Sequence, residues 1–243
     1  MYLILGASGS GRREVLVDLI VDGLGGADRP AVLISDREVP DPADERLPGL
    51  GRWRLLPEAG VEADFPQEAT HVFIVVDGGH NPVDQIEALK NWLAGQPAEL
   101  ARIICVVDCQ LAEKHPKLFA WFEACIHFSD VVLLNHRDGV PNKWIGDFRE
   151  KFEDKFYPCL FEYVKEGRVK NPALVLAPVA RRMSHVFDEQ EWIAEDDEDE
   201  EDAEDGDEVE MKPEEDHYFE RRSGGRRIHE IPHIEAFLPK PPE

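Results

Sequence analysis

The chain has 243 residues, with 27 Lys and Arg against 51 Asp and Glu and a formal net charge of −24. Residues 188–216 hold nineteen acidic residues and one basic residue, so they carry −18 and the other 214 residues carry only −6. This balance argues against nucleic-acid binding, because neutralising phosphates requires clustered Lys and Arg, and against attraction to anionic membrane surfaces.

No apolar run approaches the ~18 to 20 residues that a transmembrane helix needs. The N-terminus begins with the apolar residues 2–5 and a glycine loop, which leaves no room for a secretion signal, and we expect a cytoplasmic protein. The four cysteines, at spacings of 4, 16 and 34, match neither a C-x-x-C redox pair nor a zinc ribbon. We expect buried, reduced thiols.

Short apolar runs alternate with amphipathic stretches along the first hundred residues, a pattern typical of βα units around a parallel sheet. We expect strands at residues 2–5, 31–35, 53–56, 71–76, 103–107, 131–134 and 172–176. Helices are expected at residues 13–24, 84–93, 117–127 and 144–156, and an exposed loop at residues 36–50. Right-handed crossovers then place helices on both faces of the sheet, so the predicted fold class is α/β.

Composition divides the chain into three parts. Residues 1–187 suit one globular domain, residues 188–216 form an acidic linker that we expect to be disordered, and residues 217–243 form a tail. The tail carries the pairs Arg221-Arg222 and Arg226-Arg227 among isoleucine and phenylalanine residues. It is too short to fold alone, but it could dock on the domain or bind a protein partner.

The most informative segment is a glycine-rich loop between the first expected strand and the first expected helix. It reads Gly6-Ala7-Ser8-Gly9-Ser10-Gly11-Arg12-Arg13 and has the glycine spacing of a P-loop, G-x-x-x-x-G-K-[ST]. Glycines let backbone N–H groups turn toward an anion, and the helix N-terminus adds positive charge. The candidate phosphate-binding residues are therefore Gly6, Ser8, Gly9, Ser10, Gly11, Arg12 and Arg13. A glycine turn that holds no ligand is the alternative.

Two substitutions distinguish this loop from an ordinary P-loop. Arg12 stands where the lysine is expected and still reaches a phosphate, although its planar guanidinium fits differently. Arg13 stands where a Ser or Thr hydroxyl ligates Mg²⁺, so we do not expect an ordinary magnesium site. The acidic linker is either a solvated spacer or a segment that pairs with the tail arginines or shields Arg12 and Arg13, a contact that salt would weaken.

A second candidate segment follows the strand expected at residues 131–134. Asn135-His136-Arg137-Asp138 resembles the N-K-x-D segment with which G domains read guanine, where the aspartate accepts hydrogen bonds from N1–H and the exocyclic amine. Asn135 and Asp138 keep that pair, whereas His136 replaces the lysine. Taken alone, the segment would be better interpreted as a strand end capped by polar residues.

With the loop, three further stretches resemble the CobW branch of the CobW/HypB/UreG group of P-loop GTPases. They are residues 72–82 (VFIVVDGGHNP), similar to I-E-T-S-G-x-A-x-P, residues 128–135 (FSDVVLLN), similar to A-D-V-I-L-L-N, and residues 169–173 (VKNPA), similar to N-P-x-A. The resemblance covers roughly residues 1–180. It implies a P-loop NTPase fold and binding of GTP or GDP.

The chain differs from this family at the positions that carry the catalytic carboxylate and the metal ligands. Val75 stands at the family's acidic Walker-B-like position, which leaves Asp77 and Asp36 as the remaining candidates for a catalytic carboxylate. Strand alternation predicts that Asp77 points to the same face as Val75. The family's G-C-x-C-C motif, expected between residues 56 and 71, is absent, so we expect neither a zinc site nor metal delivery. We also expect no counterpart of the family's C-terminal domain.

Histidines do not alter that expectation. His80, His115, His127 and His185 lack the spacing of metal ligands on a helix. His229 and His233 have i, i+4 spacing, but Pro232 interrupts any helix there.

The leading hypothesis is a CobW-like protein that binds guanine nucleotide with weak or absent GTP hydrolysis. Phosphoryl transfer relies on Mg²⁺ and on positioned charge, and both are depleted here, whereas backbone amides do not depend on side-chain identity. The alternative is a non-catalytic protein-interaction module derived from a GTPase, whose loop no longer takes nucleotide and whose tail binds another protein. An active metal-delivery GTPase is disfavoured by the missing cysteine motif.

Overall fold

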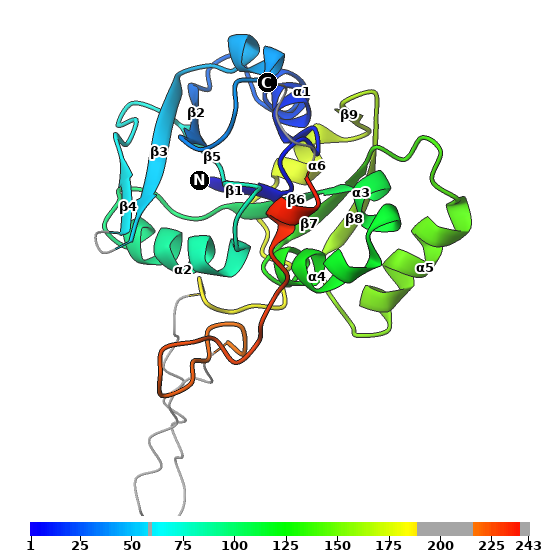
Figure 1. The fold of residues 1–243 in the computed structure, drawn as a ribbon. Coiled ribbons are helices and arrows are strands. Elements are labelled where there is room, and N and C mark those ends of the chain that lie inside the picture. The colour runs from blue at the N-terminus through cyan, green and yellow to red at the C-terminus, as the bar shows by residue number, and fades with distance from the viewer. Residues whose placement is uncertain (58–59, 189–215, 239–243) are drawn as a thin grey trace, which may run out of the picture.

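The computed structural model describes residues 1–57, 60–188 and 216–238. Within these residues the strands form one nine-stranded sheet of order β4-β3-β2-β5-β1-β6-β7-β8-β9, with helices on both faces (Figure 1). Neighbouring strands run parallel, except that β4 is antiparallel to β3 and β9 is antiparallel to β8. The predicted fold class, a mainly parallel α/β sheet, is confirmed.

The elements have the following bounds. The strands are β1 Tyr2–Gly6, β2 Pro30–Ser35, β3 Leu50–Leu56, β4 Gly60–Ala63, β5 His71–Val75, β6 Arg102–Asp108, β7 Val131–Asn135, β8 Leu160–Lys165 and β9 Arg168–Val169. The α-helices are α1 Arg12–Gly23, α2 Pro82–Leu93, α3 Cys109–Lys114, α4 Phe119–His127, α5 Asn142–Glu153 and α6 Pro172–Leu176. Short 3-10 helices are η1 Pro42–Arg46, η2 Pro116–Leu118 and η3 Ile234–Ala236.

Side chains of the central strand β1 alternate between two hydrophobic cores, one on each face of the sheet. Leu3 and Leu5 join the core that α2, α4 and α5 cover, whereas Tyr2 and Ile4 join the core that α1 and α6 cover. Because both faces are buried, the central strands consist of continuous apolar runs, which is what made them visible in the sequence. All four cysteines are buried free thiols, as expected.

One expected strand is wrong. Residues 172–176 form helix α6, which begins with Pro172 in its first turn and is capped by Asn171, whose side chain accepts a hydrogen bond from Leu174 N. Proline suits the first turn of a helix because no intrahelical bond uses its nitrogen there. The apolar run was too short for periodicity to separate a strand from a buried helix. Elements β4, β8, β9 and α3 were not anticipated, and the loop expected at 36–50 contains η1.

The tail docks on the domain. Tyr218, Phe219 and Ile234 are buried, and Phe219 stacks on Phe128 with 5.7 Å between ring centroids. In Figure 1 the tail runs from below α4 up to η3, which lies at the carboxyl edge of the sheet. Residues 189–215 of the acidic linker lie outside the described residues, so its expected disorder and its expected contacts stay predictions. None of the helices in the described part of the chain has the length and apolar character that crossing a bilayer requires.

Candidate functional site

The glycine-rich loop lies at the carboxyl edge of the sheet, between β1 and α1. Gly6, Gly9 and Gly11 have φ angles of 131°, 82° and 81°, a region that side-chain-bearing residues rarely occupy. A Cβ on Gly6 would lie 2.3 Å from Val106 O, and one on Gly11 would lie 2.4 Å from Asn135 Nδ2. Both glycines are therefore needed for the loop to fit between β6 and β7.

Some of the loop's backbone donors are already used within the chain. Ser8 N donates to Gly78 O at 3.2 Å, and Ser10 N donates to Ala7 O at 3.1 Å. Within the described residues, the backbone N–H groups of Gly9 and Gly11 and of the first three residues of α1, Arg12, Arg13 and Glu14, have no acceptor. These donors lie at the N-terminus of α1, where the helix dipole also favours an anion.

A carboxylate already occupies the side-chain part of the loop. Glu38 Oε1 accepts hydrogen bonds from Arg12 Nη2 at 2.5 Å, from Ser8 Oγ at 2.8 Å and from Gly78 N at 2.8 Å. Its Oε2 accepts a bond from Arg13 Nη2 at 3.0 Å. The Glu38 side chain is only 4% exposed, so this is a buried anion surrounded by donors.

The electrostatics keep this carboxylate ionised. Burial alone would raise the pKa of Glu38, but the charge of Arg12 and the hydrogen bonds from Gly78, Arg12 and Ser8 outweigh it and lower the pKa to about 2. At neutral pH the site therefore contains a complete internal counter-ion for its arginines.

Both arginines are fully engaged. Arg12 Nη1 also donates to Val76 O at 2.5 Å, and Arg13 Nη1 donates to Val39 O at 2.7 Å and to the Asp44 carboxylate at 3.1 Å. From the sequence, we expected these guanidinium groups to be available for binding a phosphate. In the structure they form internal ion pairs, and a ligand that uses them must compete with Glu38.

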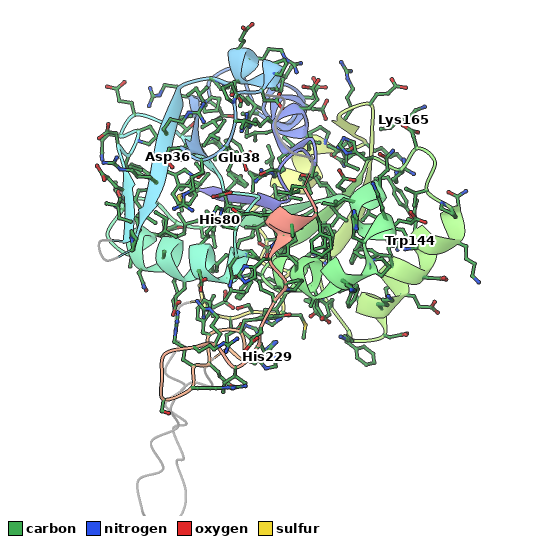
Figure 2. The ribbon with its side chains drawn as sticks, viewed as in Figure 1. Asp36, Glu38, His80, Trp144, Lys165 and His229 are labelled. Atoms are coloured by element: carbon green, nitrogen blue, oxygen red, sulfur yellow. The ribbon has the colours of Figure 1, made fainter. Side chains whose placement is uncertain are left out.

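The acidic residue at the loop is not the one that the sequence indicated. Asp36 is exposed, whereas Glu38, two residues further on, points into the loop; both lie beside β2 in Figure 2. After the buried end of β2 at Ser35, the chain exposes residues 36 and 37 and then turns back inward. The sequence indicates only that Glu38 lies close to the end of β2. The turn that points its side chain into the loop depends on tertiary contacts.

Asn135 and Asp138 occupy different environments. Asn135 ends β7, and its buried side chain donates through Nδ2 to Ser10 O at 2.9 Å, which ties this segment to the loop. Asp138 is exposed, and its backbone oxygen accepts a bond from Gln110 Nε2 at 2.8 Å. Between them, His136 adopts a positive φ of 49°, and its hydrogen bond with Asp108 raises its pKa. The structure thus brings Asn135 to the loop and leaves the Asp138 carboxylate facing solvent.

Asp77 belongs to a neighbouring pocket. Its Oδ1 accepts a bond from Gly79 N at 2.8 Å, and its Oδ2 lies 2.6 Å from His80 Nδ1. Strand alternation predicted that Asp77 points to the same face of the sheet as Val75. That expectation is wrong, because Val75 packs in the core under α1, whereas Asp77 lines the pocket at the start of α2. Strand β5 ends at Val75, and beyond it the backbone turns.

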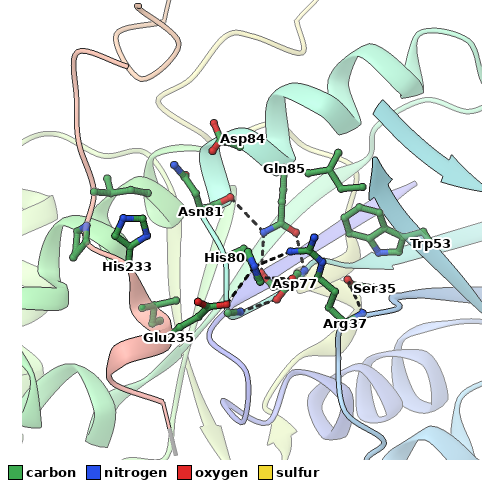
Figure 3. Close-up of a pocket in the computed structure, with 15 residues that line it drawn as sticks. Ser35, Arg37, Trp53, Asp77, His80, Asn81, Asp84, Gln85, His233 and Glu235 are labelled. Atoms are coloured by element: carbon green, nitrogen blue, oxygen red, sulfur yellow. Dashed lines mark hydrogen bonds and ion pairs between the residues drawn. The ribbon is translucent and has the colours of Figure 1, made fainter. Parts of the chain in front are cut away.

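The pocket beside Asp77 has a volume of about 280 Å³ (Figure 3). One wall comes from the ends of β2 and β3 and the start of α2, and the other from residues 231–235 of the tail. His80 Nε2 lies 2.7 Å from Arg37 Nη1 and 3.2 Å from Glu235 Oε1, so it connects the domain to the tail. His233 lines this pocket, whereas His229 packs on His217, so the structure separates that histidine pair.

Comparisons with known proteins add little to this geometry. The chain matches no protein-family model and no curated protein. Similar solved structures include the zinc-bound YjiA GTPase from E. coli, with 13% identity and a TM-score of 0.40, and a zinc-bound triple mutant of YjiA GTPase, with 15% identity and a TM-score of 0.41. Each match covers 74% of this chain and 65% of the other chain. At that level of similarity, function has to come from the site's own atoms.

Proposed function

We propose that this chain is a CobW-like, guanine-nucleotide-binding protein with weak or absent hydrolysis, in which Glu38 takes the place of a terminal phosphate. The observation that carries the proposal is the set of four donors on the Glu38 carboxylate, from Arg12, Arg13, Ser8 and Gly78. In a P-loop the cation at the Arg12 position reaches the β and γ phosphates. An anion that Arg12 holds therefore lies at the distal end of the phosphate path.

The proximal phosphates would use the backbone. The N–H groups of Gly9, Gly11 and Arg12, which have no acceptor in the described part of the chain, lie at the N-terminus of α1, and none of them depends on the missing lysine. A nucleoside diphosphate can occupy them while Glu38 stays in place. A triphosphate must displace a buried carboxylate from two arginines, and separating a buried ion pair is costly. We therefore expect a preference for GDP over GTP.

The magnesium ligand and the carboxylate that usually support GTP hydrolysis are replaced or lie elsewhere in this chain. Arg13 occupies the position of the magnesium hydroxyl, and its guanidinium is bonded to Glu38 and Asp44. The carboxylates of Asp36 and Asp77 lie in solvent and in the neighbouring pocket respectively. Base selection is assigned to Asn135 and Asp138, where an exposed carboxylate is free to accept from the guanine N1–H and amine.

Calorimetric titration tests the proposal on the full chain, with GDP, GTP, ADP and ATP, each with and without Mg²⁺. We expect GDP to bind independently of Mg²⁺ and at least about tenfold more tightly than GTP, which corresponds to about 1.4 kcal/mol. Glu38→Gln should reduce the difference in affinity between GDP and GTP, because it removes the competing charge and keeps the size of the side chain. Absence of heat with every nucleotide would defeat the proposal.

Glu45→Gln is the matched control. Glu45 is exposed in the same segment, so its substitution changes the net charge equally without touching the loop. An equal effect of the two substitutions on the GDP to GTP ratio would show that Glu38 acts only through net charge.

The second candidate is a non-catalytic interaction module with a closed loop. The observation that favours it is that both terminal nitrogens of Arg12 and of Arg13 already donate to acceptors from the chain itself. In that case no nucleotide binds to wild type or to Glu38→Gln, and the ion pairs serve only to hold the segment after β2 against α1.

A further inference from the structure

Three residues that could ligate a metal meet where the tail joins the end of α4. His127 Nε2 lies 2.8 Å from Asp216 Oδ2, and the rings of His127 and His217 are 4.7 Å apart between centroids. One nitrogen or oxygen atom from each of these residues can be chosen so that all three lie within 4.8 Å of one another. The two parts of the site are separated by 89 positions in the chain, which is why spacing in the sequence could not reveal it.

Burial and hydrogen bonds hold two residues of this cluster in a defined geometry. The side chains of His127 and Asp216 are each only 6% exposed, and Asp216 is held in place by Ser184 Oγ and by Tyr218 N at 3.0 Å. The ring of His217 is 48% exposed, so one side of the cluster is open to solvent. Such an arrangement offers two fixed ligands, one adjustable ligand and an open side for a fourth position.

We propose that His127, Asp216 and His217 bind Zn²⁺ and thereby fasten the tail to the end of α4. Two imidazoles and a carboxylate form a ligand set that zinc accepts at about 2.0 to 2.2 Å, with water completing the site. Ligand atoms around a tetrahedral zinc lie roughly 3.3 Å apart at those bond lengths. Binding would therefore draw the exposed His217 ring inward and separate His127 Nε2 and Asp216 Oδ2 slightly from their present 2.8 Å. Zinc takes the position of the proton that His127 and Asp216 share.

The sequence before Asp216 supports a role for a cation. Residues 188–216 carry −18 and end at Asp216, and such a charge attracts divalent cations. The described tail beyond it is held mainly by ion pairs with α2 and by a few buried side chains. A metal at its first two residues would fix the point at which the tail begins.

The test is a zinc titration of the chelator-treated full chain, followed by calorimetry in excess Mg²⁺. Magnesium occupies oxygen-only sites on the acidic segment and does not compete well for imidazole. We expect one zinc equivalent, a rise in Tm on zinc binding, and a visible tetrahedral absorption spectrum when Co²⁺ replaces zinc. His217→Ala should weaken zinc binding by at least about tenfold.

His185→Ala is the matched control, because His185 also pairs with an aspartate, Asp188 at 2.8 Å, but lies outside the cluster and is 84% exposed. The His185→Ala variant should bind zinc with the same affinity as wild type. His217→Asn provides a second variant if the alanine variant has a lowered metal-free Tm. Zinc binding that disappears in excess Mg²⁺, or that is unchanged in both His217 variants, would overturn the proposal.

Discussion

Two arginine clusters in this molecule have similar partners and very different surroundings. At the loop, Arg12 and Arg13 pair with Glu38, and the three side chains are 3% to 6% exposed. In the tail, Arg227 pairs with Asp84 and Glu87 of α2, whose side chains are 50% and 31% exposed. The Arg227 side chain is itself only 7% exposed, so the difference lies in the carboxylates. Water can solvate Asp84 and Glu87 when Arg227 is removed, whereas every member of the loop cluster is buried.

The largest expected effect is therefore at the loop. Glu38→Ala should lower the free energy of unfolding by about 3 to 5 kcal/mol, because it leaves two buried guanidinium groups without their shared anion. Urea unfolding followed by circular dichroism measures it. A loss below about 1 kcal/mol would mean that solvent enters the cluster and that the contrast with the tail is smaller than the burial indicates.

The pH dependence of stability should sharpen the same contrast. Glu38 has a pKa of about 2 in the folded chain against an ordinary value of 4.5, so its stabilising contribution is complete above pH 4.5 and is lost as the pH falls toward 2. The shift corresponds to about 3 kcal/mol. Urea unfolding from pH 2 to 7 should show a steeper acid loss in wild type than in Glu38→Gln. Parallel curves for the two proteins would contradict it, and Glu45→Gln should follow wild type.

A smaller effect is expected in the tail. Arg227→Ala should cost about 1 to 2 kcal/mol, because it removes charged hydrogen bonds to the partly exposed carboxylates of Asp84 and Glu87, a hydrogen bond to the backbone oxygen of Tyr218 and a cation–π contact with Phe219 at 5.6 Å. Hydrogen exchange should show the loss as faster exchange in residues 216–238, while the strands stay protected. Equal acceleration throughout β1 and β6 would show that tail and domain unfold together.

The smallest effect is expected for a fully exposed pair. Arg54 and Glu62 contact each other at 2.8 Å on β3 and β4, and both side chains are 53% exposed. Arg54→Ala should change the free energy of unfolding by less than about 1 kcal/mol, and 0.5 M salt should remove the difference. A larger, salt-independent change in urea unfolding would show that the side chain stabilises the β3–β4 pair by packing.

The parts of the fold that were predictable share one physical property. Strands β1, β2, β5, β6 and β7 are buried on both faces, so their positions appear as apolar runs in the chain. Strands at or next to the edges of the sheet, such as β4 and β8, carry polar residues that contact water, and they gave no such signal. The error at residues 172–176 arose because a five-residue apolar run has no measurable period.

The candidate site was predictable only in its backbone. Gly6 and Gly11 had to be glycine for reasons that the loop spacing already expressed, and the structure supplies the neighbours, Val106 and Asn135, that a Cβ would strike. Glu38 could not be singled out among 51 acidic residues, because its role depends on a turn that brings it to Arg12 from 26 positions away.

The sequence by itself determined the layered α/β architecture, the glycine loop at the mouth of the first helix and the segregation of charge into residues 188–216. These features are local, because periodicity, loop spacing and composition are properties of neighbouring residues. Only the tertiary structure decided that Glu38 neutralises the loop arginines and that His127 meets Asp216. Both contacts join distant segments, and their formation depends on how the sheet and the tail pack rather than on any pattern along the chain.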